Sequence, residues 1–201
     1  MTMGKQSPEG LEAETATRLS VTVEAICSKF ADSFHVQLTE IGLLRLEASE
    51  LRFIFPRELV HAGSIPLNSN AVAARTARSR RAELFNQFAG IPHGSIFKRI
   101  RLHEAEKDAP TVIQKLMPAP IIAKNGAVVG VIQISRKGAT HHAAGLDFQH
   151  EDLQRLVLAA SDIAHVLPLL AMPGRRVPFH KLNFCNHVVG TDVAASLSQT
   201  R

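Results

Sequence analysis

The sequence predicts an α+β domain that begins and ends with an amphipathic helix and carries β-hairpins between the two helices. Two observations support this prediction. Near both ends of the domain, apolar residues recur every three or four positions, which is the period of a helix with one buried face. Between these stretches, shorter runs alternate apolar and polar residues, and turn dipeptides such as Asn125-Gly126 follow them, which is typical of hairpins.

The composition is that of a globular chain with one sizeable core. The chain has 201 residues, of which 45% are apolar and 20% are charged. We therefore expect a flexible segment at 1–10, one domain at 11–170 and a partly disordered tail at 171–201. The net charge of +5 favours an anionic ligand, nucleic acid or an acidic partner, and it says nothing about the fold.

Neither a secretory signal nor a membrane span is expected. Cys27 and Cys185 lie far apart and lack the dense cysteine framework of small secreted domains, so we expect a reduced, cytoplasmic protein. The most apolar run of the C-terminal half, 156–172, does not read as a membrane span because polar residues and proline break it. These residues are Ser161, Asp162, His165 and Pro168.

A helix is predicted at the start of the domain. Ser7-Pro8-Glu9 suits a helix start, because proline is tolerated at the first helical position. Six apolar residues then recur at spacings of three and four, close to a heptad seam. They are Ala16, Leu19, Val23, Ile26, Phe30 and Phe34. Cys27 lies beside this stripe, and a small buried hydrophobe is a simpler interpretation of it than a reactive thiol.

Two strands, at 39–46 and 51–55, are predicted to form a hairpin around the charged turn at 47–50. In the second strand large apolar residues alternate with others, so one face carries the bulk of the apolar surface. Pro56 ends this strand.

A helix with a basic side is predicted at 71–82. The short extended segment 63–67 leads into Asn68-Ser69-Asn70, whose side chains can each accept a free N–H group at a helix start. A solvated basic face is the simpler interpretation of the arginines on this helix, and a dedicated anion site is the alternative. The arginines on one side are Arg75, Arg78 and Arg81.

Two further extended segments follow. Residues 96–102 alternate apolar and basic side chains, which predicts a strand with one charged face. Residues 112–123 contain Pro118 and Pro120, and proline within a strand implies an edge, a bulge or a bend.

The strand predicted at 127–135 is the most informative. One set of alternating residues is Val128, Gly130, Ile132 and Ile134, and the other is Val129, Val131, Gln133 and Ser135. The first set is apolar and suits packing against helices, whereas the second turns polar toward its end. Gln133 and Ser135 therefore need hydrogen-bond partners, which protein, water or a ligand can supply.

The last predicted element is a helix from Gln149 to Leu167, ended by Pro168. Phe148 and Leu153 stand in the relation of a hydrophobic staple at its start. His141-His142, ahead of this helix, invites a metal interpretation. Adjacent residues of an extended chain point apart, however, and no spacing here supplies further zinc ligands, so we treat the pair as polar loop residues.

Several short motifs resemble those of the GAF domain family, the ligand-sensing relative of the PAS domains. They are Ile65-Pro66-Leu67, Asn125-Gly126, Val129-Gly-Val-Ile-Gln133, Arg136-Lys137-Gly138 and Phe148-x-x-x-Asp152. The resemblance covers roughly residues 11–170. It implies a central antiparallel sheet of about six strands, with N- and C-terminal helices on one face and a pocket with a helix and loops on the other. It also implies a homodimer formed through the first and last helices.

The chain departs from the ligand-specific patterns of that family. Arg136 stands where the cyclic-nucleotide-binding members carry Asn, and Leu153 stands where they carry Glu. The placement of Cys27 and Cys185 matches neither the bilin-binding members nor the members that reduce methionine sulfoxide. The ligand and any cofactor therefore stay unidentified.

The resulting hypothesis is a stand-alone small-molecule sensor that acts through dimerisation or on a partner chain. Its expected ligand-binding residues are Asn68, Phe85, Asn86, Phe97, Gln114, Met117, Gln133 and Ser135. The alternatives are a redox enzyme on the same scaffold and a ligand-free interaction or dimerisation module. No catalytic or metal-ligating residues are assigned, and specific nucleic-acid binding is not expected because no recognition motif is present.

Overall fold

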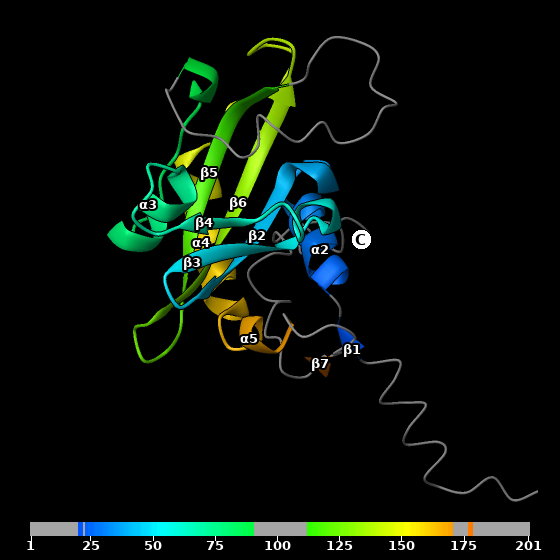
Figure 1. The fold of residues 1–201 in the computed structure, drawn as a ribbon. Coiled ribbons are helices and arrows are strands. Elements are labelled where there is room, and N and C mark those ends of the chain that lie inside the picture. The colour runs from blue at the N-terminus through cyan, green and yellow to red at the C-terminus, as the bar shows by residue number, and fades with distance from the viewer. Residues whose placement is uncertain (1–19, 22, 91–111, 171–176, 179–201) are drawn as a thin grey trace, which may run out of the picture.

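A curled antiparallel sheet of five strands forms the centre of the computed structural model, which describes residues 20–21, 23–90, 112–170 and 177–178 (Figure 1). The strand order is β4-β3-β2-β6-β5. These strands are Ile41–Glu47 (β2), Glu50–Phe55 (β3), Ser64–Pro66 (β4), Val112–Ile122 (β5) and Val128–Gly138 (β6). The predicted α+β class is confirmed, and the sixth predicted strand, 96–102, lies outside the described residues.

Helices cover both faces of the sheet, as predicted (Figure 1). On the helical face lie α2 (Val23–Phe34), α4 (His150–Ile163) and the short α5 (Leu167–Leu170), which share one hydrophobic cluster with the sheet. On the opposite face, here called the α3 face, lies α3 (Val72–Ser79), which belongs to a second cluster. Short 3-10 helices span Leu38–Glu40 (η1), Arg57–Leu59 (η2) and Phe88–Gly90 (η3). No helix of the described residues is long and apolar enough to span a membrane.

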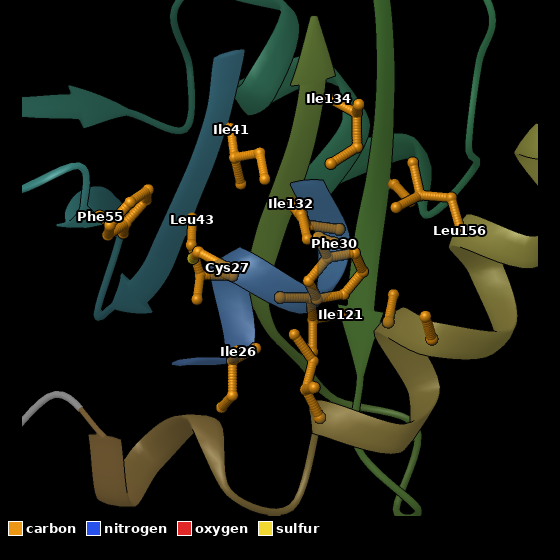
Figure 2. Close-up of a cluster of buried hydrophobic side chains, with 14 of the residues drawn as sticks. Ile26, Cys27, Phe30, Ile41, Leu43, Phe55, Ile121, Ile132, Ile134 and Leu156 are labelled. Carbon is orange, nitrogen blue, oxygen red and sulfur yellow. The ribbon is translucent and has the colours of Figure 1, made fainter. Parts of the chain in front are cut away.

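The larger core lies between the sheet and the helical face (Figure 2). Phe30 of α2 is fully buried against Ile132 and Ile134 of β6, and Leu156 of α4 closes the same cluster. The Phe30 ring stacks on that of Phe34 with centroids 6.3 Å apart. Burial of a side chain of this size stabilises the fold by about 1.5–3 kcal/mol, so the spacing of the predicted stripe has a direct energetic consequence.

The smaller core lies on the α3 face. Leu44 and Phe53 of the first hairpin and Val131 of β6 are buried there against Ala73 and Ala77 of α3. The two small alanine side chains let the helix approach the sheet closely. The apolar side of this short helix therefore lies mainly over β5 and β6, with further contacts to β4.

Strand β6 alternates as predicted along most of its length, but not at its start. Ile132 faces the helical face, and Gln133 therefore faces the α3 face. At the start of the strand the pairing with β5 shifts register between Ile121 and Ile122. Val129 consequently packs with the helical-face cluster and Val128 with the α3-face cluster, so the predicted faces of these two residues were wrong.

The proline residues of β5 mark a sheet edge, which is one of the three possibilities that the sequence left open. β5 is the last strand of the five, and its outer edge meets the segment that follows α3. Leu116 donates its N–H to Phe85 O over 2.8 Å and accepts from Phe85 N–H over 2.9 Å. The backbone N–H and C=O groups of successive strand residues point to alternate sides, so Pro118 and Pro120 direct their nitrogen and C=O to the same outer edge as Leu116. The hydrogen bonds between β5 and β6 therefore do not need an N–H from either proline.

The predicted first helix begins later than its apolar stripe. Ser20–Val21 forms strand β1, paired with Val177–Pro178 (β7), and the helix starts at Val23. A single helix from Ala16 to Phe34 is therefore wrong, because distant residues near the C-terminal end supply pairing partners that local periodicity does not reveal.

The ends of the other two helices also differ from prediction. The N-cap residue of α3 is Ala71, not one of the three residues before it, and the helix ends at Ser79 because Arg80 adopts a left-handed conformation with φ 58°. The closing helix ends at Ile163, and Pro168 lies within α5. Proline fits the first turn of α5, where its missing N–H has no intrahelical acceptor.

Candidate functional site

On the α3 face, a buried side-chain oxygen of Gln133 has no hydrogen-bond partner among the described residues. Gln133 is 3% exposed, and its side-chain Oε1 is buried with no hydrogen-bond partner. Its neighbours in register are Pro118 on β5 and Gly42 on β2, and neither carries a side-chain donor. A buried amide oxygen without a hydrogen bond lowers the stability of the fold by about 1–3 kcal/mol. A hydrogen-bond donor from outside the described residues would remove this penalty.

The two polar residues beside Gln133 already have partners. Ser135 donates its hydroxyl to the backbone oxygen of Glu40 over 2.8 Å, which ties η1 to β6. Gln114 donates its Nε2 to the backbone oxygen of Gly138 over 3.1 Å. Each side chain is buried and fulfils a structural role, so Gln133 is the member of the three whose side-chain oxygen lacks a partner.

Two aromatic side chains, Phe85 and Phe88, lie near Gln133 and Ser135. Ser135, Leu116 and Phe85 are neighbours across β6, β5 and the segment paired with its outer edge. The Phe85 ring lies 6.0 Å from the Phe88 ring and 5.3 Å from the guanidinium of Arg75. Leu116 and Phe88 belong to one small apolar cluster. A ligand bound to the polar residues could pack against this cluster.

Other predicted ligand-binding residues lie elsewhere. The Asn86 amide is occupied by the backbone of Phe148, and Met117 is fully buried in the helical-face core. Asn68 is exposed in the turn before α3, and Phe97 lies outside the described residues. The structure therefore brings together Phe85, Gln133 and Ser135 of the predicted set and separates Met117 from them by the thickness of the sheet.

A polar groove of about 600 Å³ lies on the opposite side, at the start of α4. It is lined by side chains that include Lys115, Arg136, His141, Asp147, Asp152 and Arg155. The Nζ of Lys115, 1% exposed, donates to Asp147 Oδ1 over 2.8 Å, and His141 Nε2 lies 3.2 Å from the same oxygen. The hydrogen bond from Lys115 holds the pKa of Asp147 below its usual range.

Sequence reasoning missed this groove as a site. One signal was a lysine, Lys115, inside an otherwise apolar strand, because a lysine at that position must find an anionic partner when the strand is buried. Its partner is 32 positions along the chain, and no local pattern predicts such a contact. Among the described residues, no three His, Cys, Asp or Glu side chains gather closely enough to hold a metal ion.

Arg75, Arg78 and Arg81, the arginines on the basic side of α3, are exposed, as the simpler interpretation expects, and the first two also contact neighbouring segments. Arg78 donates to the backbone oxygens of Leu67 and Ser69, the latter over 2.9 Å, and Arg80 donates to that of Gly126 over 2.5 Å. Arg75 pairs with Glu83 over 3.1 Å. Arg78 thus contacts the turn before α3, Arg75 the segment after it, and Arg80 the turn between β5 and β6.

Cys27 lies in the helical-face core with no exposed surface. Its burial, together with the negative charge of Glu24, raises the pKa of its thiol far above the usual value. The thiolate is the reactive form of cysteine, so both the burial and the raised pKa disfavour reaction of Cys27 in the folded chain. Cys185 lies outside the described residues.

No protein-family model and no curated protein matches the sequence. Solved structures resemble the fold over about three quarters of the chain. The GAF domain of an Acinetobacter phosphoenolpyruvate-protein phosphotransferase has a TM-score of 0.51 and 14% identity, and the match covers 78% of this chain and 92% of that one. For residues 122 to 287 of a methyl-accepting chemotaxis protein the TM-score is 0.54, with 13% identity and coverage of 74% and 87%.

A third similar structure is an enzyme. The type II free methionine-R-sulfoxide reductase from Thermoplasma acidophilum has a TM-score of 0.50 and 15% identity, and the match covers 78% of this chain and 94% of that one. At such low identities these similarities describe the fold and leave the function to be argued from the site.

Proposed function

We propose that this chain, whose fold is GAF-like, is a regulatory domain that senses a small molecule on the α3 face of its sheet. The observation that carries the proposal is the buried, unpartnered Oε1 of Gln133. A molecule that donates an N–H or O–H to this oxygen would remove an unfavourable free-energy term that the free protein bears. Specific recognition needs few such polar contacts, provided that apolar neighbours exclude water around them.

The neighbours of Gln133 supply those apolar contacts. Leu116 and Phe88 are buried on this side of the sheet, and Phe85 lies next to Leu116 at its edge. We therefore expect a ligand with a flat or apolar body and at least one hydrogen-bond donor. If this face were only packed core, an amide oxygen without a hydrogen bond would destabilise it with no compensating benefit.

Strand β6 links this face to the helices on the other side. Gln133 lies between Ile132 and Ile134, which pack in the cluster formed with α2 and α4. A ligand that draws Gln133 toward it therefore shifts two core residues under the helices. Such a shift can alter how α2 and α4 meet a second copy of the chain or another partner.

The exposed side of α4 supports association through that helix. Val157 and Leu158 are 45% and 48% exposed, although both are large and apolar. We propose that they contribute to a homodimer in which the last helix, with α2, forms the interface. The cytoplasmic location expected from the sequence belongs to the same proposal.

The experiment that tests ligand binding is native mass spectrometry of the protein after incubation with a metabolite extract of its expression host. The wild-type chain is expected to retain a small molecule. In Gln133→Met, which keeps the side-chain volume but removes the acceptor, retention is expected to be lost. Gln154→Met, the same change at an exposed position on α4, serves as the matched control and is expected to retain the molecule.

Two results would contradict the proposal. One is a wild-type chain that carries no added mass from any extract tested. The other is equal retention by the wild type and Gln133→Met, since a ligand that does not need the Oε1 atom binds somewhere else.

A redox enzyme is the alternative that the sulfoxide reductase among the similar structures favours. Such chemistry needs a reactive thiol, and Cys27 is fully buried with a raised pKa. The described residues thus give this alternative no nucleophile, and the sensing function is the better supported of the two.

A further inference from the structure

In the polar groove on the helical side, one cation has no carboxylate partner among the residues that the structure describes. Three basic side chains reach the groove from different elements: Lys115 from β5, Arg136 from β6 and Arg155 from α4. Lys115 is paired with Asp147, and Arg155 is paired with Asp152. None of the carboxylates in the described part of the chain lies within ion-pair distance of Arg136.

The guanidinium of Arg136 is nevertheless held firmly. Its Nη1 and Nη2 donate to the backbone oxygens of His35 and Phe34, each over 3.1 Å, at the C-terminal end of α2. Its charge lies 4.7 Å from the centre of the Phe148 ring. These contacts fix the planar group in position before any ligand arrives, which lowers the entropic cost of binding.

The hydrogen-bonding capacity of Arg136 exceeds what the protein uses. A guanidinium carries five N–H donors, and the protein accepts from two of its nitrogens. Its third nitrogen, Nε, is buried without a hydrogen-bond partner. A cation with spare donors at the wall of an open groove is suited to an oxyanion, because charge-assisted hydrogen bonds to arginine are the strong ones.

The loop between β6 and α4 shapes the approach to Arg136. Gly145, with φ +79°, passes over the guanidinium, and a Cβ built there would lie 3.9 Å from Nη1. The absence of a side chain at this position leaves the guanidinium uncovered from that direction. The next residue, Leu146, also lines the groove and is 83% exposed, the highest value among the exposed large hydrophobic residues of the described chain.

We propose that this groove binds a small organic acid, whose carboxylate pairs with Arg136 and whose apolar body covers Leu146. The carboxylate compensates the charge that the protein leaves unpaired, and the apolar body removes the exposed surface of Leu146 from water. The volume of about 600 Å³ is in the range of small-molecule sites. This site lies across the sheet from Gln133, so it goes beyond the sensing site proposed above.

The test is an NMR titration of the full-length 15N-labelled chain with benzoate, acetate and inorganic phosphate. Benzoate is expected to shift the amide signals of residues 141–149 and to bind more tightly than acetate, which lacks the apolar body. In Arg136→Gln the affinity for benzoate is expected to fall tenfold or more. Arg81→Gln removes the same charge from an exposed position in the segment after α3, which does not line the groove, and is expected to leave the affinity unchanged.

A second variant keeps the proposal testable if Arg136→Gln fails to fold. Leu146→Ser changes an exposed side chain, so the fold is expected to survive. This variant is expected to weaken benzoate several-fold while leaving acetate as it was. Gln133→Met is expected to leave benzoate binding unchanged, which separates this site from the one on the α3 face.

Four results would overturn the proposal. They are equal benzoate affinity in the wild type and Arg136→Gln, an unaltered preference for benzoate in Leu146→Ser, the absence of shifts in residues 141–149 at millimolar benzoate, and tighter binding of phosphate than of benzoate. The last would show that charge alone is recognised and that the groove does not select an organic acid.

Discussion

Asn86 and Phe148 exchange two hydrogen bonds, although 62 positions separate them in the chain. The Nδ2 of Asn86 donates to the backbone oxygen of Phe148, and the backbone N–H of Phe148 donates to Asn86 Oδ1, both over 3.0 Å. This pair joins the segment after α3 to the residue that precedes the α4 N-terminus. It also holds Phe148, whose ring contacts Arg136, at the edge of the helical-face core.

Replacement of Asn86 by alanine is therefore expected to destabilise the fold. The change leaves a backbone N–H and a backbone oxygen of Phe148 without partners in a partly buried place, which costs about 1–3 kcal/mol. Chemical denaturation measures this loss as a lower midpoint. Asn70→Ala, at an exposed position, is the control and is expected to change the free energy of unfolding by less than about 0.5 kcal/mol. Equal effects of the two changes would contradict a structural role for the pair.

Gly130 is expected to tolerate no side chain. A Cβ at this position would lie 2.3 Å from the backbone oxygen of Leu44 and 2.5 Å from Leu167 Cδ2. The first contact is with the backbone of the neighbouring strand, which cannot move without breaking the sheet, so Gly130→Ala is expected to cost about 1–3 kcal/mol or more. Gly90→Ala has no atom within 4 Å of its new Cβ and serves as the control in a thermal melt. A melting temperature unchanged by Gly130→Ala would show that α5 and β2 do not meet at this glycine.

Asp147 is expected to make the stability of the domain depend on pH. Its pKa is lower in the folded chain because Lys115 donates a hydrogen bond to it. The stabilisation is complete above the ordinary aspartate pKa of about 3.9 and is lost as the pH falls through the lower folded-state value. Asp147→Asn is thus expected to lower the melting temperature at pH 7, with a difference from wild type that shrinks below about pH 4.

The control for this pH profile is Asp32→Asn, which changes an exposed carboxylate on α2. It is expected to leave the melting temperature nearly unchanged at both pH values. A difference between wild type and Asp147→Asn that stays constant from pH 7 to pH 3 would show that ionisation of Asp147 is not the cause.

Cys27 is expected to be unreactive while the chain is folded. Its thiol is fully buried and its pKa is raised, so the thiolate is scarce at neutral pH. In a Cys185→Ser variant, a thiol reagent such as Ellman's reagent is expected to find no fast-reacting group until guanidinium unfolds the protein, after which one thiol reacts. Rapid labelling of the native variant would instead place Cys27 in a dynamic and accessible part of the chain.

The sequence predicts those features that depend on local periodicity. The alternation of Ile132 and Gln133 follows from the two-residue period of a strand, and it places the orphaned amide on the correct face. The missing N–H of Pro118 limits it to an edge, a bulge or a bend, and the structure has it at an edge. In both cases the chemistry of a short local stretch restricts the structure, independently of residues far away in the chain.

Features that depend on distant residues escape prediction. Arg136 donates to the end of α2, more than 100 positions away, and Lys115 finds Asp147 across the β6–α4 loop. The two-residue pairing of β1 with β7 likewise makes the first helix start later than predicted, at Val23. Tertiary packing decides these contacts, because the local sequence is compatible with several partners.

Leu158 provides the clearest test of the proposed homodimer. It is large, apolar and 48% exposed on α4, beside the similarly exposed Val157. In a two-fold dimer the interface contains Leu158 from both subunits, and burial of the two side chains together stabilises the dimer by about 3 kcal/mol. Leu158→Glu is therefore expected to raise the dimer dissociation constant at least a hundredfold. Ala89→Glu places the same charge on an exposed residue of η3 and is expected to leave the dimer intact. Sedimentation velocity at micromolar protein separates the cases, and a monomeric wild type would exclude Val157 and Leu158 as a dimer interface.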